Sequence, residues 1–112
     1  MAHDAATRLA VYGTLSPGKV NAHVLADIRG IWREGTVRGQ LFEIGWGAAQ
    51  GFPGLVLDPS GQAVAVHLLE SADLPAHWDR LDAFEGSNYR RVVATVSTDI
   101  GMLEASIYEV VR

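Results

Sequence analysis

The sequence predicts an α+β domain in which a small, mostly antiparallel sheet is accompanied by short helices. Most of its apolar segments are short, rich in valine, leucine and isoleucine, and separated by turns that contain glycine or proline. The last two of these segments are joined by a tight turn, which predicts a hairpin and therefore antiparallel pairing. Together these observations favour a small mixed or closed sheet over a doubly wound parallel one.

The 112-residue chain is predicted to form a single domain over residues 1–112, because 48% of it is hydrophobic and only 20% is charged. Its formal charge is −4 and its basic residues are scattered, which gives no signal for nucleic acid or an anionic membrane surface. It contains no cysteine, and its N-terminus lacks the apolar core of a signal peptide. We therefore expect a cytoplasmic protein with a small-molecule partner; oligomeric state is not encoded in any recognisable pattern.

The first half of the chain carries signals for two strands, a helix and a long loop. Residues 8–12 form a short apolar run that ends at a glycine, which predicts a buried strand. Apolar residues recur at helical spacing between Gly18 and Gly30, which predicts a short helix. Residues 36–44 alternate well enough for a strand, whereas residues 45–54 contain too many glycines for regular structure and predict a loop.

The second half contains four further strand-like segments. Residues 55–57 and 62–70 flank the sequence Asp-Pro-Ser-Gly at 58–61, which is typical of a turn between strands. Residues 90–97 and 103–111 are both rich in β-forming residues and are separated by a short polar turn. The chain is therefore expected to close with a hairpin.

A second short helix is predicted between these two pairs of strands. Either Ser71 or Asp73 can cap its N-terminus, and Pro75 is suited to the first turn. We expect the helix to end near Gly86. Its apolar face would consist of Leu74, Trp78, Leu81 and Phe84.

The segment "VYGTLSPGKV", residues 11–20, comes close to the spacing of a nucleotide-binding P-loop, with Gly13, Gly18 and Lys19 in place. A working P-loop needs Ser or Thr directly after the lysine to hold magnesium, and this chain has Val20 there. A glycine and a proline after a strand can also form a simple turn. The residues alone leave a turn and an anion-binding loop open, and disfavour nucleotide binding.

Four motifs, taken in order, resemble the gamma-glutamylcyclotransferase-like family. They are "VYGTLSPG", "NAHVL", "FPGLV" and "LDAFEGSNYRR", and the match extends over residues 9–110. The short chain is most similar to the compact bacterial branch and to the gamma-glutamylamine cyclotransferases. The resemblance implies a small, mostly antiparallel β-barrel flanked by short helices, with a cavity where the first strand ends.

The resemblance also implies an activity and a site. Residues Tyr12, Gly13, Thr14 and Leu15 would bind the glutamyl end of a γ-glutamyl amide, largely through backbone N–H groups. Glu85 would act as general acid/base while the substrate cyclises to 5-oxoproline and releases an amine. Consecutive N–H groups near a glycine suit a carboxylate as well as they suit a phosphate. The reaction requires no metal or cofactor, and the four histidines lie too far apart in sequence for a local metal motif.

Several of these residues have ordinary structural roles as alternatives. Tyr12, Tyr89 and Tyr108 can supply hydroxyl groups to a cavity or simply fill the core. Glu85 can be a solvated charge at a helix end. The main alternative function is a non-catalytic protein of the same fold that binds a small carboxylated metabolite.

Overall fold

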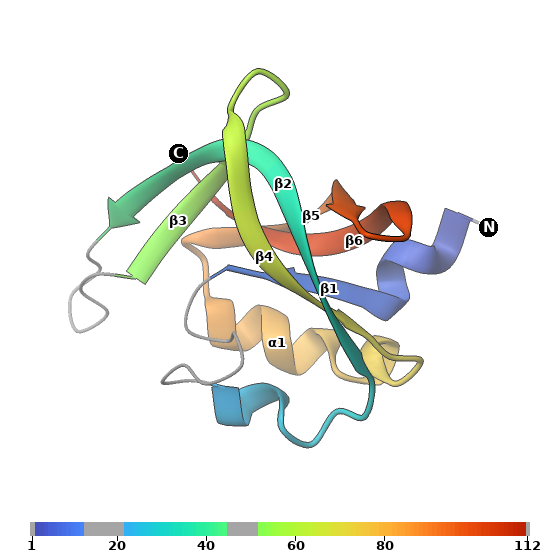
Figure 1. Cartoon of the computed structure of the whole chain (residues 1–112). Coiled ribbons are helices and arrows are strands. Elements are labelled where there is room, and N and C mark those ends of the chain that lie inside the picture. The colour runs from blue at the N-terminus through green and yellow to red at the C-terminus, as the bar shows by residue number, and fades with distance from the viewer. Residues whose placement is uncertain (1, 13–21, 45–51, 112) are drawn as a thin grey trace.

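The computed structural model describes residues 2–12, 22–44 and 52–111. In this part of the chain six strands form one sheet in the order β3-β2-β4-β1-β6-β5, and an additional pairing of β2 with β5 closes it into a barrel (Figure 1). Strand β3 lies beside β2 as an extra edge strand. The strands are β1 (Arg8–Val11), β2 (Ile31–Ile44), β3 (Phe52–Leu57), β4 (Gln62–Glu70), β5 (Tyr89–Thr98) and β6 (Gly101–Val110).

The pairing is mostly antiparallel, as predicted. The exception is β1, which is antiparallel to β4 but parallel to β6. Closure depends on β2, which is long enough to pair with β4, with β3 and, at Gly35 and Thr36, with the end of β5. A Cβ atom on Gly35 would lie 2.7 Å from the Val96 side chain and 2.8 Å from the Ser97 carbonyl oxygen, so glycine permits this close approach.

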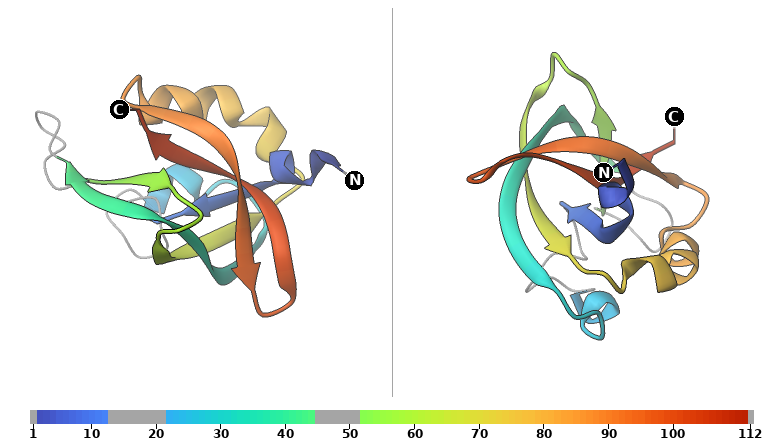
Figure 2. Two further views of the ribbon diagram at one scale, coloured as in Figure 1. Left: turned by 90° about the horizontal axis from the view of Figure 1, so that it is seen from above. Right: turned by 90° about the vertical axis from the view of Figure 1, so that its right-hand side faces the viewer.

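Helix α1 (Trp78–Glu85) is the α-helix of the described residues, and it lies outside the barrel (Figures 1 and 2). Trp78 and Leu81 are buried as predicted, but Phe84 is 43% exposed and does not complete the apolar face. The single-turn 3₁₀ segment η4 (Leu74–Ala76) precedes α1. The other 3₁₀ segments are η1 (Ala2–Thr7) and η2 (Ala22–Leu25).

Apolar side chains pack in two separate layers. The barrel interior is filled by residues from all six strands: Ala10, Val37, Leu55, Val64, Val66, Leu68, Ala94, Val96, Ala105 and Ile107. A second cluster lies between the outer face of the sheet and the helical segments: Leu9, Val11, Leu25, Ile28, Leu69, Leu74, Trp78, Leu81 and Tyr108. Strands β1, β4 and β6 contribute to both layers, which explains why residues 105–110 are buried on both faces.

One predicted element and two predicted boundaries are wrong. The helix expected between Gly18 and Gly30 is a single 3₁₀ turn in its described part. Strand β2 begins at Ile31 rather than at residue 36. Strand β3 begins at Phe52, inside the predicted loop over residues 45–54, because an edge strand tolerates a proline that an inner strand would not.

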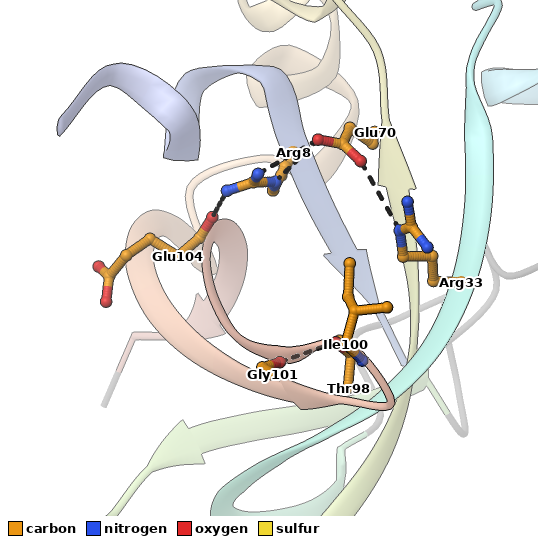
Figure 3. A network of polar contacts seen from close by, with 7 residues as sticks. All are labelled: Arg8, Arg33, Glu70, Thr98, Ile100, Gly101 and Glu104. Carbon is orange, nitrogen blue, oxygen red and sulfur yellow. Dashed lines mark hydrogen bonds and ion pairs between the residues drawn. The ribbon is translucent and has the colours of Figure 1, made fainter. Parts of the chain in front are cut away.

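Figure 3 shows a polar network at the end of the barrel where β1 begins. Arg8 contacts Glu70 on β4 at 3.2 Å and donates to the carbonyl oxygen of Glu104 on β6 at 3.3 Å. Arg33 on β2 lies 3.7 Å from the same Glu70 carboxylate. These contacts join four strands at the opposite end of β1 from Tyr12. Within the described residues, no helix is long and apolar enough to cross a membrane.

Candidate active site

Glu85 is the last residue of α1 and its side chain is half-buried. The helix ends there because Gly86 adopts a φ of 82°, which favours glycine, and its N–H donates to the carbonyl oxygen of Asp82 at 3.1 Å. The chain then turns into β5 at Tyr89. Glu85 is therefore held at the junction between the helix and the barrel.

The environment of Glu85 raises the pKa of its carboxyl group to about 7. Burial is the larger cause, because a charged carboxylate loses solvation there, and the negative charge of Asp82 adds to it. The alternative that Glu85 is a freely solvated charge at a helix end does not fit this half-buried side chain. A carboxyl group with this pKa exchanges protons readily near neutral pH.

Asp82 lies one helical turn before Glu85 and has the opposite environment. Tyr108 on β6 donates its hydroxyl to Asp82 Oδ1 at 2.6 Å. Arg91 on β5 donates from Nε to Oδ1 at 2.9 Å and from Nη2 to Oδ2 at 3.2 Å. These donors, the Arg91 bonds first, hold the pKa of Asp82 below its usual range. Asp82 is therefore a permanent carboxylate beside Glu85.

Tyr12 follows directly after β1 and connects three strands through its hydroxyl group. It donates to the carbonyl oxygen of Tyr108 at 2.7 Å and accepts the backbone N–H of Leu55 on β3 at 3.1 Å. Burial raises the pKa of Tyr12 well above its usual range; the hydrogen bond from the Leu55 N–H opposes this rise, and the negative charge of Glu85 adds to it. Tyr12 therefore remains a neutral phenol and lies close enough to Glu85 to be influenced by its charge.

A second carboxylate, Glu109 on β6, was not identified from the sequence. It is buried, it accepts the backbone N–H of Leu57 at 2.8 Å, and it pairs with Arg90 at 3.2 Å. Tyr12 and Glu109 thus satisfy two N–H groups of β3 that face away from β2. Strand β3 is fixed to β6 by side chains rather than by backbone pairing, and the sequence carried no signal for this arrangement.

The structure brings four of the predicted site residues together from four elements. Tyr12 bonds to Tyr108, and the pKa of each is raised, first by burial and then in part by the charge of Glu85. Tyr89 is half-buried at the start of β5 and packs against the outer apolar cluster. The remaining three predicted residues, Gly13, Thr14 and Leu15, lie outside the described residues, as do Gly18 and Lys19 of the P-loop-like segment.

Comparison with protein families matches residues 9–112 to the model described as "Gamma-glutamyl cyclotransferase, AIG2-like". No curated protein matches the chain at a significant level. YkqA from Bacillus subtilis is a similar solved structure, with 30% sequence identity and a TM-score of 0.71. The match covers 93% of this chain and 35% of YkqA, so the chain spans about a third of that protein.

Two other solved structures are matched by this chain over most of their own length. An AIG2-like protein from Mus musculus has 24% identity and a TM-score of 0.74, and the match covers 92% of this chain and 76% of that one. The uncharacterized protein PH0828 from Pyrococcus horikoshii has 26% identity and a TM-score of 0.62, and the match covers 93% of this chain and 77% of that one. The family model, the barrel topology and these folds agree: the chain belongs to the gamma-glutamyl cyclotransferase, AIG2-like family.

Proposed function

We propose that the protein is a gamma-glutamylcyclotransferase-type enzyme that converts a γ-glutamyl amide to 5-oxoproline and a free amine, with Glu85 as general acid/base. The observation that carries this proposal is the half-buried Glu85 carboxyl group with its pKa raised to about 7. It is supported by membership of the family over residues 9–112. Tyr12, next to the predicted glutamyl-binding loop, lies within electrostatic reach of Glu85.

The raised pKa matters because the reaction begins with removal of a proton from an α-ammonium group. An α-amine has a pKa near ~7.7–8.0, whereas an ordinary Glu carboxyl group titrates near ~4.3. Proton transfer to such a carboxylate is uphill by roughly 5 kcal/mol. A pKa of about 7 for Glu85 reduces this cost to about 1 kcal/mol. The base is therefore matched to the proton it must accept.

The proposed reaction forms one C–N bond and breaks another. The α-nitrogen, after it gives a proton to Glu85, attacks the γ-carbonyl carbon, and the resulting tetrahedral intermediate expels the amine. Protonated Glu85 supplies a proton to the departing nitrogen. Of the α-ammonium protons, one stays on the lactam nitrogen and two end on the released ammonium ion, so the enzyme returns to its starting state.

Positioning supplies the other part of the catalysis. Both reacting groups belong to one substrate molecule, and a well-oriented intramolecular reaction reaches effective molarities of about 10⁵–10⁸ M. We propose that Tyr12, Gly13, Thr14 and Leu15 hold the glutamyl end so that the amine faces its own carbonyl. The hydroxyl bonds of Tyr12 to β6 and β3 would fix the start of this loop.

The test is release of 5-oxoproline from a panel of γ-glutamyl amides by wild type and by Glu85→Gln. The variant preserves side-chain shape and removes the base, so kcat should fall by about 10²–10⁴. Glu34→Gln, which neutralises an exposed carboxylate on β2, is the matched control and should leave kcat unchanged. Turnover of the best substrate by Glu85→Gln at the wild-type rate would rule out Glu85 as the catalyst. Binding of 5-oxoproline with no turnover by wild type would instead favour the carboxylate-binding alternative.

A further inference from the structure

We propose that Asp82 is a positioning residue for Glu85: clamped by Arg91 and Tyr108, it fixes the C-terminal end of α1 against the sheet and keeps a permanent negative charge beside the acid/base. This inference rests on the proposed role of Glu85. It assigns a function to a cluster of polar side chains that the reaction itself does not use.

Asp82 receives three hydrogen bonds from the barrel. Arg91 on β5 contributes two, at 2.9 and 3.2 Å, and Tyr108 on β6 contributes one at 2.6 Å. Residues three apart on a helix are neighbours on its surface, so a clamp on Asp82 also places Glu85. The clamp acts in the last turn of α1, where a helix otherwise frays.

Arg91 is itself held in place from its other side. Its guanidinium group lies 4.3 Å from the centre of the Trp78 ring, and the Trp78 indole N–H donates to the carbonyl oxygen of Ala6 at 3.0 Å. Trp78 is the first residue of α1 and Asp82 lies one turn later, so Arg91 contacts the helix at two successive turns. The planar guanidinium allows the cation–π contact and the two-bond pairing at once.

Asp82 also differs in charge from the other titratable groups around Glu85. The described titratable groups near it are Asp82 on the same helix, Tyr12 at the end of β1 and Tyr108 on β6, while Tyr89 on β5 lies near Tyr12. Tyr12 and Tyr108 remain neutral because burial raises the pKa of both well above the usual range. Asp82 is thus the charged group among the described residues that raises the pKa of Glu85.

Arg91 limits this effect without cancelling it. Its positive charge sits on the Asp82 carboxylate and over Trp78. Removing Asp82 and removing Arg91 should therefore change the proton affinity of Glu85 in opposite directions. A purely structural role for the cluster predicts loss of stability in both variants and no opposite shifts.

The experiment is the pH dependence of kcat for the full chain with the best γ-glutamyl amide. In wild type the rate should rise with pH as Glu85 loses its proton. In Asp82→Asn this rise should move to lower pH by about half a unit, the size expected of a neighbouring charge across a partly solvated surface. The plateau rate should fall by roughly tenfold, because the base is weaker and the helix end is less fixed.

Further variants make the result interpretable. Arg91→Gln should move the rise to higher pH, and Asp82→Glu, which retains the charge, should restore the wild-type midpoint. Asp79→Asn removes the same charge from an exposed position on α1 and should leave the profile unchanged. If Asp82→Asn does not fold, the direction of the Arg91→Gln shift decides the question.

Failure of this inference is distinguishable from failure of the proposed function. Identical pH midpoints in wild type, Asp82→Asn and Arg91→Gln would overturn the role of Asp82 while Glu85→Gln still abolished turnover. Full activity of Glu85→Gln would overturn the proposed function itself. Opposite shifts of the midpoint in the Asp82 and Arg91 variants would support both.

Discussion

The raised pKa of Glu85 predicts that this residue lowers the stability of the folded protein above neutral pH. The folded state holds the Glu85 proton more tightly than the unfolded chain does, since the pKa rises from 4.5 to about 7. Stability from this group is therefore fully present below about pH 4.5 and is lost as the pH rises through about 7. Glu85→Gln, which is neutral at every pH, should keep that stability.

The size of the effect follows from the difference between the two pKa values. A shift of one unit corresponds to about 1.36 kcal/mol, so at about pH 8 the ionised Glu85 costs up to about 3 kcal/mol of folding free energy. Between about pH 5 and pH 8, Glu85→Gln should gain roughly 2–3 kcal/mol relative to wild type. For a domain of this size that gain corresponds to a rise in Tm of about 10 °C at the higher pH.

The assay is urea unfolding of wild type and Glu85→Gln at several pH values across this range. Glu34→Gln on β2 is the control, because its carboxylate is exposed and its stability difference from wild type should not vary with pH. A difference between Glu85→Gln and wild type that stays constant from about pH 5 to pH 8 would refute the reasoning. It would mean that the Glu85 carboxyl group has an ordinary proton affinity in the folded state.

Two further variants test the elements that hold the site. Tyr12→Phe should lower the free energy of unfolding by about 2 kcal/mol, because the buried Leu55 N–H loses its acceptor and the Tyr108 carbonyl loses a donor. Chemical denaturation measures this loss, and faster hydrogen exchange at the Leu55 N–H would confirm its cause. Gly86→Ala should lower the free energy of unfolding by about 1–3 kcal/mol, since φ of 82° with ψ of −177° is adopted almost exclusively by glycine. A thermal melt that shows equal stability for Gly86→Ala and wild type would contradict this prediction.

Local patterns predicted the local structure well. The Asp-Pro-Ser-Gly turn forms as expected: Gly61 N–H donates to the carbonyl oxygen of Asp58 at 2.8 Å, and Ser60 N–H donates to the Asp58 side chain at 2.9 Å. The C-terminal hairpin forms over β5 and β6 with continuous register. These features depend on residues close together in the sequence, and their propensities act in the same direction.

Contacts between distant segments could not be predicted in this way. Tyr12 and Tyr108 are 96 positions apart, and their hydrogen bond depends on the parallel register of β1 and β6. Arg90 and Arg91 are adjacent on β5 and, because side chains alternate along a strand, they face opposite sides: Arg90 pairs with Glu109 and Arg91 with Asp82. The pairing register of β5 with β6 decides which of these two arginine side chains lies on the side of α1. The prediction that the sheet closes into a barrel came from the family resemblance and not from any local pattern.

The hydrogen-bond and ion-pair partners of Asp82, Glu109 and Glu85 distinguish acidic residues with a structural role from the candidate catalyst. Asp82 is bound by Arg91 and Tyr108, and Glu109 is bound by Arg90 and the Leu57 N–H. The donors to Asp82 lower the pKa of its carboxyl group, and the partners of Glu109 tie β6 to β3 and β5.

Glu85 has a different environment, because the two causes of its shift, burial and the charge of Asp82, both favour the protonated form. Neighbouring acids whose pKa values are driven apart are the usual arrangement of a site that must keep one charge fixed and move one proton. The lowered pKa of Asp82 and the raised pKa of Glu85, one helical turn apart, meet that description. Because the charge on Asp82 also raises the proton affinity of Glu85, the clamp that holds the helix end contributes to the acid/base role proposed for Glu85.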